Sequence, residues 1–223
     1  MQSPPARLRA LRKALNKDMN TKEILSELER LYPDAKPALH YKTPYELLVA
    51  VILSAQCTDE RVNKVTAVLF EKYNTPQSMV TLSQEQLETY IFSCGFYRNK
   101  AAHILSASRD ILDKFGGEVP SKFEDLRTLA GVGQKTANVV YAVAFGGDAI
   151  AVDTHVFRVS RRLGLASANT PERVEEDLKK VIPQKDWSKA HHWLIWHGRK
   201  VCHSQKPDCS ACTLKELCPS KRV

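Results

Sequence analysis

Lys135 is the residue of this chain best placed to act as a nucleophile. It follows a tight loop, Gly131-Val132-Gly133, and lies in the first turn of a predicted helix that begins near Gln134. Glycines allow loop conformations in which several N–H groups converge on one anion, and a helix N-terminus adds partial positive charge. The stretch therefore predicts a phosphate-binding hairpin with an amine beside it. The simpler alternative is that the glycines only turn the chain.

Asp153 is a second residue whose side chain could take part in catalysis. It directly precedes a predicted helical run from Thr154 to Leu163. A carboxylate in that position is an ordinary helix N-cap, and on sequence alone this is the simpler interpretation. A cap also fixes the carboxylate in place, so capping and catalysis are compatible.

Four cysteines fall within 17 residues: Cys202, Cys209, Cys212 and Cys218. Thiolates are preferred ligands of zinc and of iron–sulfur clusters. Zinc ribbons usually carry two C-x2-C knuckles, whereas this segment has one knuckle and two wider spacings. The spacing favours a 4Fe–4S cluster, with zinc as the main alternative and disulfides as a third. Cys57 and Cys94 lie in apolar segments and are expected to be buried as small hydrophobic residues.

The formal net charge of +8 is concentrated toward the two ends of the sequence. Residues 1–17 carry five basic and no acidic residues, and residues 199–223 carry six basic and two acidic residues. This distribution predicts a localised surface for a polyanion rather than a uniformly basic protein. Residues 1–17 are expected to form a flexible extension, either a solvated tail or part of that surface.

The clustered cysteines, together with the lack of a recognisable export signal, point to a reducing compartment. No apolar run is long enough to cross a membrane, and residues 1–17 lack the apolar segment of a secretory signal. Clustered cysteines without such a signal more often bind metal than form disulfides. We therefore expect a cytoplasmic protein.

The pattern of apolar residues predicts an all-α protein. Predicted helices cover Asn20–Tyr32, Leu47–Ala55, Asp59–Tyr73, Tyr97–Phe115, Thr154–Leu163, a run from Thr170 to before Pro183, and Trp187–Val201. Capping boxes are predicted at Thr43, Ser83 and Ser121. The Leu47–Ala55 run is nearly all apolar, so a buried central helix is expected there. Strand-like alternation is almost absent.

Several short features occur together and in order along the chain. They are Leu53–Asp59, Gly95–Ala101, the hairpin with Lys135, Ala151–His155, His191–Arg199 and the four-cysteine spacing. Together they resemble the endonuclease III family of bifunctional DNA glycosylases, in the helix-hairpin-helix superfamily. The resemblance covers about residues 20–220. The cysteine spacing is the family's own, which implies a 4Fe–4S cluster held by these cysteines.

The resemblance implies two all-α domains that flank a DNA-binding cleft. A six-helix domain would span 37–147. The cluster domain would combine 1–36 with 148–223, so the chain leaves that domain and returns to it. A break at Pro33 and Pro37 fits the first crossing.

The resemblance also implies catalytic roles. Lys135 matches the nucleophile that attacks the sugar, expels a damaged base and forms a Schiff base, after which β-elimination breaks the strand. Asp153 matches the aspartate that assists deprotonation of the lysine and stabilises positive charge on the sugar. The alternative for Lys135 is a lysine that only contacts a phosphate.

Further residues are implied to contact DNA. Gln56 matches the residue that fills the gap left by an extruded base, and Phe96 would be the wedge on the opposite strand. Phe96 departs from the aliphatic residue often found there, and an ordinary core phenylalanine is the alternative. The loop of Gly131, Val132 and Gly133 would bind a phosphate. Arg199 and Lys206 are expected to meet phosphates beside the cluster loop.

The expected function is base excision repair of double-stranded DNA. A monomer would remove oxidised pyrimidines and incise the resulting abasic site. The alternatives are a pyrimidine-dimer or mismatch glycosylase of the same superfamily, and a non-catalytic iron–sulfur DNA-binding module.

Overall fold

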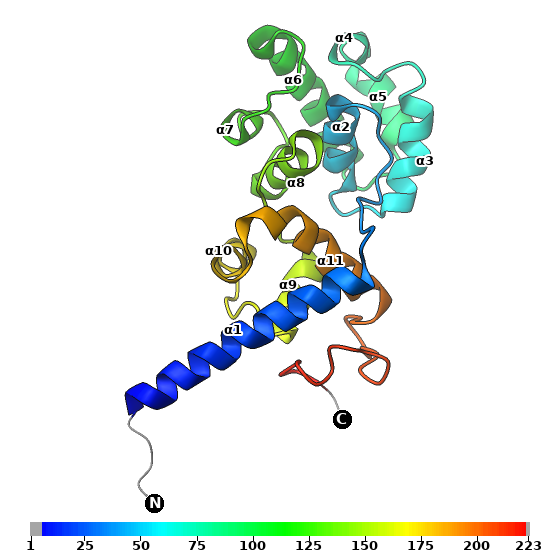
Figure 1. The fold of residues 1–223 in the computed structure, drawn as a ribbon. Coiled ribbons are helices and arrows are strands. Elements are labelled where there is room, and N and C mark those ends of the chain that lie inside the picture. Colours follow the sequence, from blue (N-terminus) through cyan, green and yellow to red (C-terminus); the bar gives the residue numbers. More distant parts are fainter. Residues whose placement is uncertain (1–5, 222–223) are drawn as a thin grey trace, which may run out of the picture. The chain divides into compact units, whose positions relative to one another are not determined.

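The computed structural model describes residues 6–221, with side chains from residue 18 onward, and every regular element in this part of the chain is a helix (Figure 1). The predicted all-α class is confirmed. The elements are α1 (Ala6–Leu31), α2 (Pro44–Ser54), α3 (Asp59–Leu69), α4 (Pro76–Met79), α5 (Gln84–Ile91), α6 (Tyr97–Phe115), α7 (Phe123–Leu126), α8 (Gln134–Phe145), α9 (Thr154–Arg162), α10 (Pro171–Val181), the 3-10 helix η1 (Gln184–Asp186) and α11 (Trp187–Lys200). None of these helices is both long and apolar enough to cross a membrane.

The chain divides into two compact units. One unit comprises Pro37–Ala151, and the other combines the residues up to Lys36 with those from Val152 onward. The second crossing thus lies four residues later than the boundary at 147 that the sequence suggests. The side-chain amide of Asn138 in α8 donates a hydrogen bond to the carbonyl of Ile150, which keeps the segment after α8 with its own unit.

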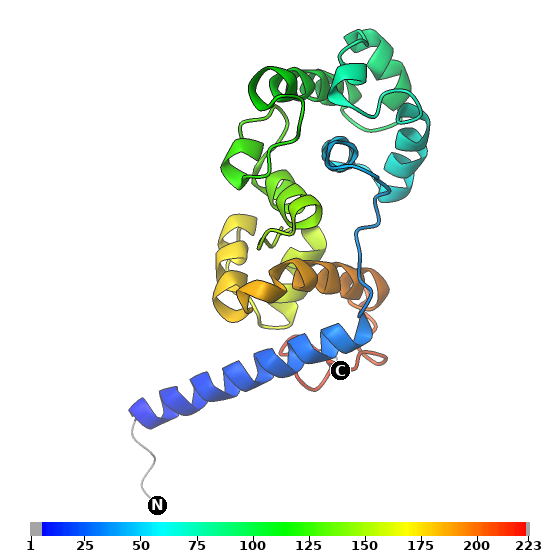
Figure 2. The same ribbon diagram turned by 45° about the horizontal axis from the view of Figure 1, so that its top comes forward.

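The unit of residues 37–151 is built around α2. Every residue from Tyr45 to Leu53 is buried, because this helix is apolar on all sides and other helices must cover it. Helices α3, α6 and α8 pack against it. Figure 2 shows α2 end-on, surrounded by the other helices of its unit. The predicted buried central helix is confirmed.

Helix starts follow local capping chemistry in most cases. Ser83 forms the predicted capping box with Gln86. At Thr43 only half of the predicted box forms, because its side chain accepts the backbone N–H of Glu46 whereas the Glu46 carboxylate accepts the backbone N–H of Lys42. The predicted box at Ser121 is wrong. Helix α7 begins one residue later than that box requires, with Lys122 at its N-cap and no side-chain cap.

The unit that contains the four clustered cysteines, called the unit of the cysteines below, is built on α1, α9, α10 and α11. Helix α11 packs against both α9 and α1, and α10 packs against α9. The expected helix start at Asn20 is wrong, because α1 begins at Ala6 and passes through Asn20 without a break. Residues 6–17 are mostly Ala, Leu, Arg and Lys, all strong helix formers. The expected flexible extension is wrong for residues 6–17, which belong to α1, and its residues 1–5 lie outside the described residues.

Candidate active site

The hairpin between α7 and α8 has the backbone that the two glycines predict. Gly131 adopts a φ of +76°, and a Cβ atom at this position would lie 2.8 Å from the Cβ of His103. Only glycine fits both the conformation and this close approach. Val132, between the glycines, is buried in the core of the unit and anchors the loop. The hairpin is therefore a fixed turn with a packed centre.

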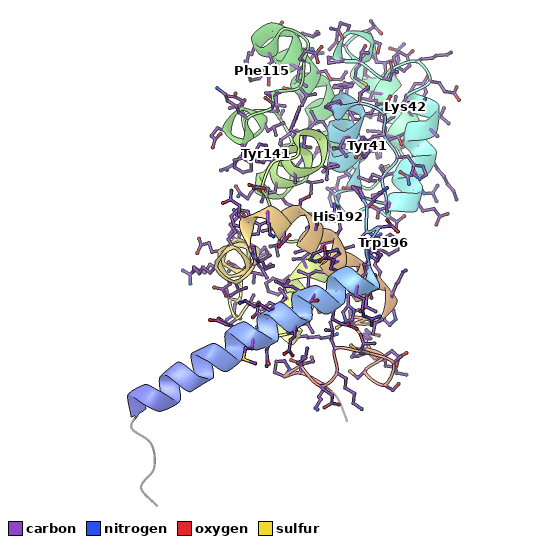
Figure 3. All side chains as sticks on the ribbon, in the orientation of Figure 1. Tyr41, Lys42, Phe115, Tyr141, His192 and Trp196 are labelled. Carbon is purple, nitrogen blue, oxygen red and sulfur yellow. The ribbon has the colours of Figure 1, made fainter. Side chains whose placement is uncertain are left out.

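Two aromatic rings brace the helices on either side of this hairpin. Phe123 of α7 packs edge-to-face against Tyr141 of α8, with the ring centroids 6.1 Å apart. Tyr141 is labelled in Figure 3. Gly147 lies against the same ring, since a Cβ there would come 2.2 Å from a Tyr141 carbon. These contacts hold α8 against α7.

Lys135 is exposed on the second residue of α8. Gly133 is the N-cap of this helix, and it offers no side-chain cap to the first turn. The first-turn N–H groups of a helix carry partial positive charge and favour an anion. The structure thus places an exposed amine beside a helix N-terminus suited to a phosphate.

Asp153 caps α9, as the sequence predicts. Its Oδ1 accepts the backbone N–H of Val156 at 2.7 Å, and the side chain is half-buried. Burial lowers the pKa of the neighbouring His155, while the carboxylate of Asp153 opposes that shift. Asp153 belongs to the unit of the cysteines and Lys135 to the unit of residues 37–151. The structure therefore describes the surroundings of each residue within its own unit.

Gln56 and Phe96 share an uncommon backbone conformation. Within residues 6–221, the non-glycine residues with positive φ are Gln56 at 52°, Phe96 at 57° and Lys206 at 49°. Left-handed conformations are costly for such residues, and they concentrate at functional sites. Phe96 is 65% exposed, so the alternative of an ordinary core phenylalanine is wrong. All three residues are among those expected to contact DNA.

The four cysteines of the predicted cluster line one pocket. Cys202, Cys209, Cys212 and Cys218 line it together with residues of α9, α11 and the loop after α11, among them Arg162, His197 and Asp208. Burial is the main cause that raises the pKa of the Cys212 and Cys218 thiols, and the other cysteines add to it. Among the described residues, no three His, Cys, Asp or Glu side chains converge where they could hold a single metal ion. Four soft thiol ligands that line one pocket fit an iron–sulfur cluster.

Two arginines of α9 hold the loop that carries these cysteines, and the sequence analysis did not identify them. Arg158 donates to the carbonyls of Cys202 at 3.1 Å and Gly198 at 3.0 Å. Arg162 donates to the carbonyl of His203 at 2.6 Å and contacts the Cys202 Sγ at 3.4 Å. The spacing of four residues places both arginines on one side of α9, and that spacing was the available signal.

Arg199 and Lys206 are both exposed near the cysteine loop. Arg199 lies in the last turn of α11, and Lys206 lies between Cys202 and Cys209 in the loop that follows. The carbonyl of Val201 accepts the backbone N–H of Asp208, which closes this loop. The loop thus presents Lys206 to solvent from a constrained backbone.

Comparisons with known proteins agree with this arrangement. The model of the HhH-GPD superfamily of base excision DNA repair proteins matches residues 49–184. Endonuclease III of Synechocystis sp. (strain ATCC 27184 / PCC 6803 / Kazusa) is 53% identical over 214 residues, which cover 96% of this chain and 98% of the relative. Endonuclease III of Escherichia coli (strain K12) is 47% identical over 199 residues, or 89% of this chain and 94% of the relative.

Solved structures show the same similarity in three dimensions. The structure of a trapped endonuclease III–DNA covalent intermediate has a TM-score of 0.88 and 48% identity, and the match covers 92% of this chain and 96% of that one. A thermostable thymine-DNA glycosylase has a TM-score of 0.83 at 23% identity, with 92% and 98% covered. This second likeness shows the shared fold.

Proposed function

Because the chain belongs to the HhH-GPD superfamily of base excision DNA repair proteins, and within it to the endonuclease III family, we propose that it excises damaged pyrimidines and incises the abasic site. The observation that carries this proposal is the exposed Lys135 in the first turn of α8, directly after the glycine hairpin. A similar protein has been trapped as a covalent intermediate with DNA. Double-stranded DNA with an oxidised pyrimidine is the substrate that this similarity favours.

Lys135 acts as the nucleophile of the reaction. Lysine amines are mostly protonated at neutral pH, so the amine must first lose a proton, and the carboxylate of Asp153 assists this step. The neutral amine attacks C1′ of the damaged nucleotide, the glycosidic C–N bond breaks, and the base leaves with a proton. The sugar ring opens to a Schiff base on Lys135.

The Schiff base then permits strand scission. A proton leaves C2′, and the electron pair of that C–H bond expels the 3′ phosphate by β-elimination. Water hydrolyses the imine, which restores the amine of Lys135 and releases the cleaved strand. Gln56 and Phe96 fill the space in the helix that the extruded nucleotide leaves. Gly131, Val132 and Gly133 of the hairpin, with Arg199 and Lys206, contact phosphates.

The four cysteines Cys202, Cys209, Cys212 and Cys218 hold a 4Fe–4S cluster. The four thiol ligands that line one pocket support this proposal. The cluster supplies a rigid fold for the loop that carries Lys206, and no step of the reaction passes through it. Purified protein should be brown and contain about four irons and four labile sulfides per chain. Colourless protein with stoichiometric zinc would contradict the assignment.

Borohydride trapping tests the lyase mechanism. The protein is mixed with a duplex that contains thymine glycol or an abasic site, and borohydride reduces any Schiff base to a stable protein–DNA adduct. Wild-type protein should form the adduct, and Lys135→Ala should form none. Without an adduct from active, cluster-loaded wild-type protein, the proposed chemistry is wrong. Excision without an adduct would indicate a monofunctional glycosylase, and neither product would indicate a binding module.

A further inference from the structure

Two loops of the unit of residues 37–151 present Gln56 and Phe96. The first loop follows α2, and the second precedes α6. The backbones of these loops pass close to each other, because a Cβ added to Gly95 would lie in van der Waals contact, at 3.5 Å, with the carbonyl oxygen of Gln56. Both residues have left-handed backbones, and Phe96 is the N-cap of α6 without a side-chain cap. Contacts elsewhere in this unit must stabilise the left-handed backbones of both residues.

Lys100 forms hydrogen bonds to both loops. Its side-chain amine donates to the carbonyl of Leu53 at 2.8 Å and to the carbonyl of Ala55 at 2.6 Å. Its backbone N–H donates to the carbonyl of Phe96 at 3.1 Å. One residue therefore holds the residue before Gln56 through its side chain and Phe96 through its main chain.

Burying the ammonium group of Lys100 costs free energy. Lys100 is 4% exposed, and burial lowers the pKa of its amine, while the nearby Cys94 and Cys57 oppose that shift. Buried ammonium groups are unfavourable unless they are hydrogen-bonded. The carbonyls at the C-terminus of α2 carry partial negative charge, which favours a cation there. An apolar residue would fill the space, yet it would leave both carbonyls without this donor.

We propose that Lys100 is a positioning residue that sets the placement of Gln56 relative to Phe96, so that both can enter the DNA helix together. This inference rests on the proposed function. Lys100 touches neither substrate nor the reacting atoms, and it acts through the two loops. Its effect is confined to steps in which a base leaves an intact duplex.

The first test compares two substrates. Lys100→Met keeps a long unbranched apolar stem and removes the donor, and Lys100→Gln, whose side chain also ends one atom short of the lysine amine but is polar, serves if the first variant does not fold. Excision from a lesion-containing duplex should fall by about 10- to 100-fold. Strand cleavage of a single-stranded oligonucleotide with an abasic site should stay within about twofold, because no helix has to be opened. Loss of both activities in a folded variant would contradict the proposal.

Lys114→Met is the matched control. Lys114 lies on the same helix, α6, but its side chain is 59% exposed and pairs with Asp110. This variant should retain both activities. An equal loss of duplex excision in Lys114→Met would overturn the assignment, because the effect would then come from any lost charge on α6.

A double-mutant cycle tests whether Lys100 acts through Gln56. If it does, Lys100→Met combined with Gln56→Ala should excise no more slowly than Gln56→Ala alone. A fluorescent base analogue opposite the lesion, measured in a Lys135→Ala background, should also lose its unstacking signal in Lys100→Met. Additive losses with an unchanged signal would refute the inference. Failure of wild-type protein to cleave abasic DNA would instead refute the proposed function itself.

Discussion

The Oδ1 atom of Asp153 accepts the backbone N–H of Val156 at 2.7 Å, and this bond fixes the carboxylate at the start of α9. The same side chain is the proposed partner of Lys135 in catalysis. Aspartate and asparagine cap helices almost equally well, whereas only aspartate can accept a proton at neutral pH. Substitutions at this residue can therefore separate the structural role from the chemical one.

Asp153→Asn should retain stability and lose catalysis. We expect its free energy of unfolding to stay within about 0.5 kcal/mol of the wild type, because the cap is preserved. Asp153→Ala should lose about 1 kcal/mol, since the cap is removed. Both variants should form much less borohydride-trapped adduct. Denaturant unfolding measures the first effect, and an active Asp153→Asn variant would contradict the catalytic role.

Individual residues differ in how well sequence alone predicted them. Asp153 was predicted correctly as a cap because its side chain bonds within three residues along the chain. Lys100 was not identified, because its partners Leu53 and Ala55 lie more than forty residues away. The exposure of Phe96 depends on how its loop is held, which no local pattern encodes. Long-range contacts, rather than residue type, limit such predictions.

Helices were easier to predict than their ends. Short-range capping chemistry gave the starts after Thr43 and Ser83, whereas the Ser121 pattern did not form a cap. The start of α1 was missed because Asn20, a good capping residue, lies inside a longer run of helix formers. A capping residue marks a helix start only when the preceding residues cannot continue the helix.

Helix α11 contains a group whose protonation should affect stability. His192, labelled in Figure 3, is buried on this helix, and burial lowers its pKa to about 3, with His191 adding to the shift. The folded protein therefore keeps this imidazole neutral at pH values where the unfolded chain, with a pKa of about 6.5, binds a proton. Stability contributed by the neutral imidazole is complete above pH 6.5 and is lost as the pH falls toward 3.

The expected pH dependence can be measured by denaturant unfolding. Between pH 6.5 and pH 4 the free energy of unfolding should fall by up to about 1.4 kcal/mol per pH unit from this group. His192→Gln should flatten the curve in this range. Identical curves for the wild type and His192→Gln would contradict the burial argument.

At the scale of the whole molecule, the basic charge gathers toward the ends of the sequence. Residues 199–221, which include the loop of the four clustered cysteines, lie within the described part of the chain. Lys206 is exposed to solvent on that loop. Contacts with phosphates release counterions, so DNA affinity should fall steeply with salt. The charge distribution was predicted from the sequence, because it requires only counting. Which lysines face DNA depends on how the loop closes.

Lys206→Gln should weaken binding to undamaged and damaged duplexes alike. The slope of log affinity against log salt concentration should decrease by about 0.9, the value for one lost phosphate contact. Fluorescence anisotropy over a salt series measures this slope. Lys64→Gln is the control, since Lys64 is 66% exposed on α3 and pairs with Glu60. An unchanged slope for Lys206→Gln would mean that this lysine meets no phosphate.

The discontinuous unit has a consequence for biosynthesis. Helix α1 leaves the ribosome first, while its packing partner α11 and the four clustered cysteines emerge only after all of residues 37–151. The intervening unit contains its whole core and can fold while translation continues. Until α11 has emerged, α1 lacks its packing partner. Cys218 is the last of the four clustered cysteines to emerge, so the proposed cluster can be completed only after the unit of residues 37–151 has left the ribosome.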